Sequence, residues 1–239
     1  MPVLSEQIIR FYKTLNPPAS LPPGVKILFP QQNPEVLQVV KSFFKKFYTD
    51  DHPRHLIFGI NPGRFGAGTT GINFTAPRQL KENCGIDHSF PDQTELSAEF
   101  IYEIIERYGG VRQFYRDWII SAVCPLGFVS GVPSFGGAGV GRSRGIKNLN
   151  YYDDKQLQQV VTPFIIDCIN KQLKWNVSRD HCFCIGEEKN FNFLSGLNKE
   201  YNWFGNIIPL PHPRFIMQYR RKQKKQYIGQ YLSALRLAR

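Results

Sequence analysis

Hydrophobic positions along the chain recur at two different spacings, and each spacing predicts its own kind of element. Apolar residues three and four apart, often behind a polar cap, predict helices over 5–15, 33–48, 94–110, 151–175, 187–197 and 218–239. Short apolar runs bounded by proline or glycine predict buried strands over 55–60, 117–126, 181–186 and 206–210. Strands and helices therefore alternate along most of the chain.

This alternation predicts βαβ units, and so an α/β fold with helices on both faces of a mostly parallel, four-stranded sheet. We expect a three-layer α/β/α domain over 1–239, because no linker or internal repeat divides the chain. Ligands of open α/β sheets bind beyond the carboxyl ends of the strands. The segments after the first, second and fourth predicted strands should therefore meet at one site.

The segment after the first strand, GINPGRFGAGTTGINF over 59–74, is rich in glycine and nearly free of charge. Such a backbone is typical of positive φ angles or of close approach to a ligand. The segment lacks the Lys and Ser/Thr pair of a Walker A loop, and no acidic residue follows it as the dinucleotide fingerprint requires. A second glycine-rich stretch over 127–148 is basic and predicts a long loop, of the kind that is usually functional or mobile.

Composition narrows the class of protein. With 42% hydrophobic residues and no signal-peptide pattern or long apolar span, we expect a soluble intracellular protein, cytoplasmic in a bacterium and nuclear in a eukaryote, with no membrane contact. The formal net charge of +11 favours a polyanionic partner such as nucleic acid. Five scattered cysteines without a CxxC pair predict reduced core thiols, and a metal site is the less favoured alternative.

Two polar residues stand just after predicted strands. Asn61 has an amide that can donate to and accept from a water molecule, although an Asn-Pro pair also commonly caps a turn. His212 lies between two prolines that would fix its backbone, and a surface histidine without a role is the alternative. Their place at the same edge of one predicted sheet favours a shared site.

The 59–74 segment, followed much later by HPR at 212–214, resembles the two signature motifs of the uracil-DNA glycosylase superfamily. The single-strand-selective monofunctional branch is the most similar, since its first motif also contains Asn-Pro-Gly, a Phe-Gly pair, Thr-Gly and a Phe. The resemblance extends through the residues that lead into CPL at 124–126 and through KNL at 147–149, and it covers most of 55–230. It implies the three-layer glycosylase fold and activity on damaged DNA.

The resemblance also implies roles for the matching residues. Asn61 matches the residue that positions the attacking water, and His212 matches the histidine that donates to the uracil O2 as negative charge develops there. Phe74 matches the ring that stacks on the extruded base, and Gly63 a backbone contact near it. We also expect Ile60, Ser121 and Ala122 to contact the base. The expected DNA contacts, including the wedge after His212, are Arg64, Phe65, Arg142, Arg144, Arg214, Phe215, Arg220, Arg221 and Lys222.

One position departs from the family pattern. Relatives place an asparagine two residues before Cys-Pro-Leu to read the pyrimidine edge, and this chain has Ala122 there. Ser121, Asn73 or backbone groups are the candidates to replace that contact. We therefore expect the substrate among uracil and related deaminated or oxidised bases in DNA, purines included.

The sequence thus predicts a monomeric, monofunctional DNA glycosylase that uses no metal and no organic cofactor. No Lys lies in the motifs to form a Schiff base, and Asn61 is no strong base, so water would intercept a sugar cation. One alternative is a catalytically weak DNA-binding relative that senses a flipped base in the same pocket. A second is a nucleotide-binding protein that uses the glycine-rich loop.

Overall fold

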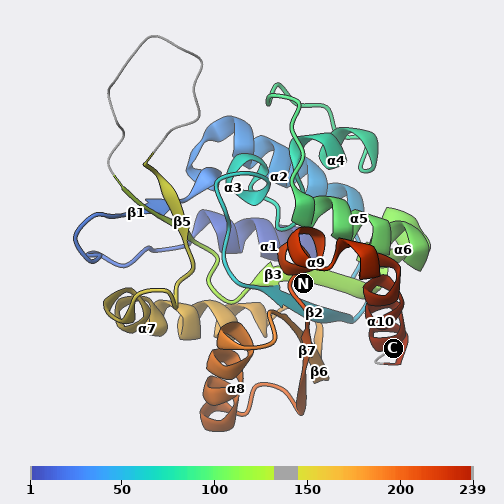
Figure 1. Ribbon diagram of the computed structural model, residues 1–239. Helices are drawn as coiled ribbons and strands as arrows, with labels where there is room; N and C mark the ends of the chain where they lie inside the picture. The colour runs from blue at the N-terminus through green and yellow to red at the C-terminus, as the bar shows by residue number, and fades with distance from the viewer. Residues whose placement is uncertain (1, 132–144, 238–239) are drawn as a thin grey trace.

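The computed structural model describes residues 2–131 and 145–237, and its centre is a parallel sheet of four strands (Figure 1). These strands are β2 (Arg54–Gly59), β3 (Trp118–Ala122), β6 (Val177–Ile185) and β7 (Asn206–Leu210). They lie in the order β3-β2-β6-β7, and all three pairings are parallel. The predicted α/β/α class and the four predicted strands are confirmed, although β3 ends earlier than the pattern indicated.

The carboxyl ends of the four strands are closely aligned, and this alignment places the site. Gly59 pairs with Ala122 across β2 and β3, and Ile185 pairs with Leu210 across β6 and β7. Beyond β3 the chain stays attached to β2, because the Val123 and Cys124 amides donate to the Gly59 and Ile60 carbonyls at 2.9 and 3.1 Å. The segments that follow the strands therefore leave the sheet side by side.

Two of the predicted helices begin at side-chain caps, whereas Ser5 lies inside α1 (Leu4–Lys13) and α5 (Leu96–Tyr108) has no side-chain cap. Asn33 accepts a hydrogen bond from the Glu35 amide at the start of α2 (Pro34–Phe47), and Asp154 accepts one from the Leu157 amide at the start of α7 (Lys155–Gln172). The other helices are α3 (Ala67–Thr70), α4 (Pro77–Glu82), α6 (Gly110–Asp117), α8 (Lys189–Tyr201), α9 (Pro213–Tyr219) and α10 (Lys224–Leu237). Two short 3-10 helices are also present, η1 (Pro30–Gln32) and η2 (Arg221–Gln223).

A second, antiparallel sheet corrects the prediction of one loop over 127–148. β4 (Gly127–Ser130) pairs with both β1 (Val25–Leu28) and β5 (Lys147–Leu149). Strands of three and four residues are too short to show a clear alternation, so no pattern in the sequence predicted them. The centre of the predicted loop, 132–144, lies outside the described residues.

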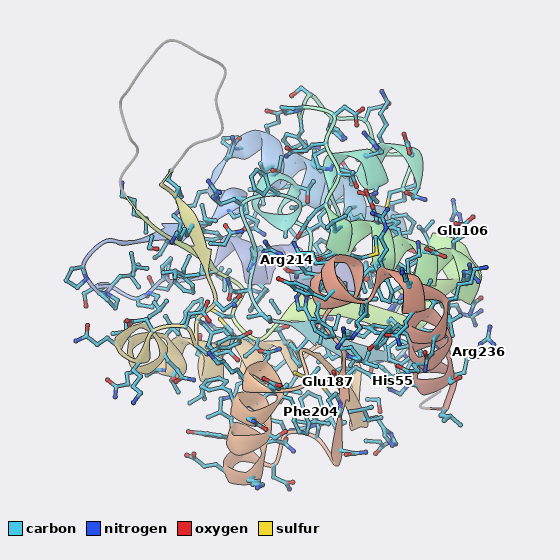
Figure 2. The ribbon with its side chains drawn as sticks, viewed as in Figure 1. His55, Glu106, Glu187, Phe204, Arg214 and Arg236 are labelled. Atoms are coloured by element: carbon cyan, nitrogen blue, oxygen red, sulfur yellow. The ribbon has the colours of Figure 1, made fainter. Side chains whose placement is uncertain are left out.

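The predicted basic helix over 218–239 is also corrected, because the chain bends in its first residues. α9 ends at Tyr219, Arg220 adopts a non-helical φ of −129°, and η2 leads into α10. Arg214 lies on α9 and Arg236 on α10 (Figure 2). The bend leaves α9 as a separate short helix directly after His212.

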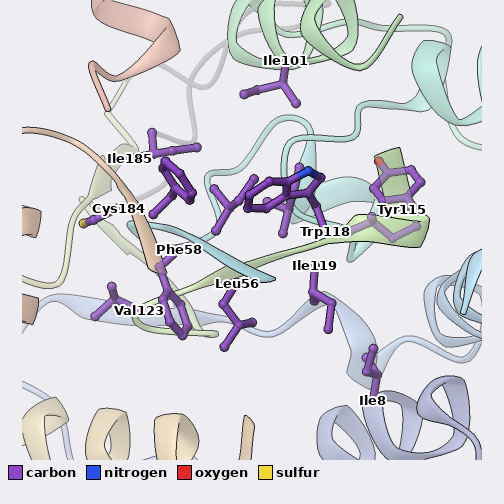
Figure 3. Close-up of a cluster of buried hydrophobic side chains, with 14 of the residues drawn as sticks. Ile8, Leu56, Phe58, Ile101, Tyr115, Trp118, Ile119, Val123, Cys184 and Ile185 are labelled. Carbon is purple, nitrogen blue, oxygen red and sulfur yellow. The ribbon is translucent and has the colours of Figure 1, made fainter. Parts of the chain in front are cut away.

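The core packs against both faces of the parallel sheet, since β2 and β3 are buried on both sides and β6 is buried over its last four residues. Figure 3 shows Leu56 and Ile119 pointing toward Ile8 of α1, while Trp118 points to the opposite face, toward Ile101 of α5. One cluster of buried hydrophobic residues runs from the first helix to the last. This packing fixes the strand ends that carry the site.

All five cysteines are buried and free, so the predicted reduced core thiols are confirmed. Within the described ranges, no group of three or more His, Cys, Asp or Glu side chains is arranged to hold a metal ion. In the same part of the chain, no helix has the length and apolar character needed to cross a membrane.

A fully buried arginine stands at the amino end of β2 and ties it to its surroundings. Arg54 Nε donates to the Tyr115 carbonyl and Nη1 to the His52 carbonyl, both at 2.8 Å, and Nη2 lies 2.9 Å from Asp50 Oδ1. The guanidinium also lies over the Tyr48 ring, 5.1 Å from its centroid. This cluster holds β2 at the end opposite the site.

We predict that Arg54→Ala lowers the free energy of unfolding by at least about 2 kcal/mol, because it leaves the buried Tyr115 carbonyl without its donor, removes the hydrogen bond to the His52 carbonyl and opens a cavity. Urea denaturation followed by circular dichroism measures the loss. Arg78→Ala is the control, because its pair with Asp92 is exposed and such pairs contribute little. Similar denaturation midpoints for the two variants would contradict this role of Arg54.

Candidate functional site

A pocket of about 350 Å³ opens at the carboxyl ends of the four parallel strands. Each strand contributes to its lining: Gly59 from β2, Ala122 from β3, Gly186 after β6 and His212 after β7. The expected convergence is confirmed for the segments after the first and fourth strands, whereas the second strand contributes Ala122 from within it and no residue of 124–131 lines the pocket. The predicted base-contacting residues that line the pocket are Ile60, Asn61, Gly63, Phe74, Ala122 and His212, and Asn73 lies beside them.

Asn61 is held by the backbone at the end of β5 and just after it. Its Nδ2 donates to the Leu149 carbonyl at 3.1 Å, and its Oδ1 accepts from the Tyr151 amide at 3.1 Å. A backbone carbonyl can only accept and a backbone N–H can only donate. These two partners therefore fix which end of the Asn61 side-chain amide is the oxygen and which is the nitrogen. One lone pair of Oδ1 remains to hold a further donor, such as a water molecule.

His212 caps α9 with its ring. The Arg214 amide donates to His212 Nδ1 at 3.1 Å, so Nδ1 is an acceptor and Nε2 carries the ring proton. Burial, reinforced by the nearby Arg214 guanidinium, lowers the pKa of His212 from 6.5 to about 4. At neutral pH the residue is therefore a neutral imidazole with one N–H to offer the pocket.

Phe74 faces His212 across the pocket, with 6.1 Å between the two ring centroids. Its backbone has a φ of 52°, a conformation that a phenylalanine adopts only when its surroundings impose it. Buried Thr70 supplies part of that constraint, because its hydroxyl donates to the Thr75 carbonyl at 2.6 Å. Gly59 leaves room for the ring, since a Cβ there would lie 2.8 Å from Phe74 Cε2.

The glycines of the 59–74 segment serve its own fold. The Gly68 amide donates to the Gly63 carbonyl at 2.8 Å, and a Cβ at Gly68 would lie 2.3 Å from that oxygen. The Thr69 and Thr70 amides both donate to the Gly66 carbonyl. Since these three N–H groups are used within the segment, they are not free to cradle a phosphate, which argues against the nucleotide-binding alternative.

Two polar residues of the pocket wall, Asn148 and Glu95, were not among the predicted site residues. Asn148 Oδ1 accepts from the Arg64 amide at 3.2 Å and so ties β5 to the glycine-rich segment. Glu95 lines the pocket, and burial raises the pKa of its carboxyl group despite opposing effects of Arg214 and the Ser97 hydroxyl. The KNL resemblance pointed to Asn148, whereas Glu95 is an ordinary residue of a helix start in the sequence and gave no signal.

Ser121 requires a correction. Successive residues of a strand point to opposite faces, so Ser121 and Ala122 cannot both face the pocket. The Ser121 hydroxyl donates to Gln172 Oε1 of α7, beneath the sheet, whereas Ala122 lines the pocket. Ser121 is therefore removed from the candidate base-contacting residues and does not replace the asparagine that Ala122 lacks.

Aromatic rings paired with arginines surround the pocket mouth. Phe65 is 52% exposed and the Arg64 guanidinium lies 5.1 Å from its ring centroid. On α9, Phe215 and Tyr219 are 41% and 69% exposed, and the Arg220 guanidinium lies 5.4 Å from the Phe215 centroid. Both rings are exposed to solvent, and Arg220 is exposed with its ring, whereas Arg64 is half-buried.

The remaining candidate DNA-contacting residues are placed as follows. Arg214 lines the pocket together with Phe215, and it also lines a second pocket of about 540 Å³, where Arg64 and Phe65 lie. Arg220, Arg221 and Lys222 are exposed on the bend between α9 and α10 and do not line either pocket. Arg142 and Arg144 lie outside the described residues.

The chain is similar to a known protein family and to a solved structure. The model of the uracil DNA glycosylase superfamily matches residues 46–236. Among solved structures, the chain is similar to wild-type SMUG2 of Pedobacter heparinus, with 42% sequence identity and a TM-score of 0.92. That similarity covers 100% of this chain and 99% of the other. A search of curated proteins found no match.

We predict that the His212 imidazole stays neutral, with its proton on Nε2, from pH 8 down to about pH 5, because its pKa is lowered to about 4. Nitrogen chemical shifts of ¹⁵N-labelled histidine rings, assigned with His212→Gln, measure the titration. The unfolded state takes up this proton first, near pH 6.5, so stability should fall as the pH drops from 6.5 toward 4. Titration near pH 6.5 in the folded protein would contradict the assignment.

Proposed function

The chain belongs to the uracil DNA glycosylase superfamily, and we propose that it is a monofunctional DNA glycosylase that hydrolyses the N-glycosidic bond of uracil or of related deaminated or oxidised bases. The observation that carries the proposal is the placement of Asn61 and His212 in one pocket at the strand ends. One offers an amide oxygen to water, and the other offers a neutral N–H to a leaving base. These are the two functions that hydrolysis of this bond needs.

The pocket suits a base turned out of the DNA stack. Extrusion costs a few kcal/mol of unstacking and unpairing, which contacts inside the pocket must offset. The Phe74 ring offers a stacking surface, and it is held against Gly59 by a backbone conformation that the Thr70 turn imposes. In this proposal the base lies on Phe74, with one of its carbonyl oxygens directed at His212.

His212 then stabilises the leaving base. As the glycosidic bond lengthens, negative charge develops on the base, and a fixed N–H donor stabilises that charge more than it stabilises the bound substrate. The hydrogen bond from the Arg214 amide holds the ring and sets its tautomer before the base arrives. Little reorganisation is needed during the reaction, which is the condition for a large electrostatic contribution.

Asn61 positions water rather than deprotonating it. An amide is not a base at neutral pH, so the bond to the base breaks well before water attacks the sugar cation. The free lone pair of Asn61 Oδ1 accepts a hydrogen bond from the water. The water oxygen adds to the anomeric carbon, and the proton that it loses passes to the departed base anion or to solvent. None of the described residues that line the pocket is a lysine, which supports hydrolysis without a Schiff base or strand cleavage.

The rim of the pocket supports DNA as the partner. The two ring-arginine pairs at Phe65 and Phe215 can stack on exposed bases, and their cations can approach phosphates. We propose that Arg220, Arg221 and Lys222, on the bend after α9, extend this track along the phosphate backbone. The proposed enzyme acts as a monomer inside the cell, where its substrate is found.

Ala122 favours one alternative to the enzyme, namely a DNA-binding protein that senses damaged bases with little activity. The side chain that lines this part of the pocket is a methyl group, which cannot form a hydrogen bond to a base edge. A protein that holds damaged bases without choosing strongly among them would act as a DNA-binding sensor of low activity. Release of free base from DNA separates the two proposals.

We predict that Asn61→Ala and His212→Ala each lower the single-turnover rate of uracil release by at least about a hundredfold, because both contacts form in the transition state. Quenched samples treated with alkali and run on a denaturing gel give the rate. Binding to the same oligonucleotide should change little, which fluorescence anisotropy measures. Lys189→Ala, a change in a cation of α8 that does not line the pocket, is the control. Wild-type rates in both site variants would refute the proposed site.

We predict that Ala122→Asn raises the rate of uracil release relative to the rates for hydroxymethyluracil, hypoxanthine and xanthine, because the new amide can pair with a pyrimidine edge. A panel of single- and double-stranded oligonucleotides with each base measures the change in selectivity. Ala122→Val, which adds volume without polar atoms, separates pairing from crowding. An unchanged order of preference in the Asn variant would show that the base is read elsewhere.

A further inference from the structure

The backbone segment that holds Asn61 is itself tied to the sheet by a buried hydrogen-bonded pair. Tyr151 donates its amide to Asn61 Oδ1 and its hydroxyl to Asn190 Oδ1 at 2.7 Å. We propose that Tyr151 and Asn190 are positioning residues that fix the amide of Asn61 from the ends of β2 and β6. This inference rests on the proposed hydrolytic function, in which Asn61 holds the water.

Asn190 connects this pair to the strands. Its Nδ2 donates to the Ile185 carbonyl at 2.9 Å and lies 3.2 Å from Cys184 Sγ and 3.5 Å from the Gly59 carbonyl. Ile185 and Gly59 are the last residues of β6 and β2. The Nδ2 group of Asn190 therefore contacts the ends of both strands, and its Oδ1 accepts the hydrogen bond from the Tyr151 hydroxyl.

We call the hydrogen-bonded chain from Asn190 through Tyr151 to Asn61 the relay, and burial makes it rigid. Tyr151 is fully buried and Asn190 is 1% exposed, so neither can exchange its partner for water without a large cost. The Tyr151 ring also packs against Phe193 of α8, with 4.9 Å between centroids. The tyrosine is thus fixed at its backbone, its ring and its hydroxyl.

The relay acts on the orientation of Asn61, not on the substrate. Tyr151 and Asn190 do not line the pocket, whereas the neighbouring Asn150 and Tyr152 do. The Leu149 carbonyl and the Tyr151 amide, two residues apart on one segment, bind opposite ends of the Asn61 amide. A shift of this segment would rotate the amide and turn its free lone pair away from the proposed water. Misplacements of about 1 Å can cost up to about a hundredfold in rate.

The test is Tyr151→Phe, which removes only the hydroxyl. We expect the single-turnover rate of uracil release to fall about tenfold, while affinity for the same oligonucleotide changes less than twofold. Tyr48→Phe is the matched control, because its buried hydroxyl also donates one hydrogen bond, to the Trp118 carbonyl at 3.1 Å, at the far end of β3. The control should keep the wild-type rate. Circular dichroism at the assay temperature verifies that both variants are folded.

A double-mutant cycle separates positioning from a general structural effect. If Tyr151 acts through Asn61, adding Tyr151→Phe to Asn61→Ala should change the residual rate less than twofold. A second tenfold loss in the Asn61→Ala background would overturn the proposal, as would a wild-type rate for Tyr151→Phe alone. Asn190→Ala should reproduce the tenfold loss and add nothing to Tyr151→Phe, and additive losses would count against the relay.

A readout without turnover keeps this inference distinct from the proposed function. In ¹⁵N-labelled protein, the side-chain amide protons of Asn61, assigned with Asn61→Ala, should shift and exchange faster with solvent in Tyr151→Phe but not in Tyr48→Phe. Unchanged Asn61 resonances would overturn the relay whatever the activity. If wild-type protein releases no base but these resonances respond, the proposed function fails and the relay stands.

Discussion

Four parallel strands end at one edge of the sheet, and every candidate function of this chain depends on that constraint. Strands in a parallel sheet run in one direction, so their carboxyl ends and the segments that follow them lie together. Gly59, Ala122, Gly186 and His212 reach the same pocket for this reason, although up to 63 residues separate neighbours among them in sequence. The core on both faces of the sheet holds these ends in register.

The groups that are proposed to react are each fixed by backbone contacts. The Asn61 amide is held by Leu149 and Tyr151, and the His212 ring by the Arg214 amide. Phe74 is held in a positive-φ conformation by the turn that Thr70 closes. Polar side chains fixed in this way lose little freedom when a substrate binds, which is what electrostatic catalysis requires. The glycines of the 59–74 segment allow the close packing on which this order depends.

Much of this arrangement could be predicted from the sequence, because apolar runs between proline and glycine mark the four strands. The carboxyl ends of these predicted strands then indicate the edge of the sheet at which Asn61 and His212 lie together. Ser121 could not be placed, since β3 is buried on both faces and shows no alternation to reveal which side each residue faces. Tyr151 and Asn190 could not be found either, because their contacts with Asn61 and with each other join segments far apart in the chain. The short antiparallel strands carried too few residues for a pattern.

The central claim is that this pocket releases a base from DNA by hydrolysis. The most direct measurement incubates the wild-type protein with a single-stranded oligonucleotide that carries one uracil, in water enriched in ¹⁸O. Mass spectrometry then follows the free base and the strand. The account predicts free uracil, an intact strand that breaks only after alkali, and ¹⁸O in the abasic sugar. DNA that is bound but yields no free base, from uracil or from related deaminated or oxidised bases, would contradict it.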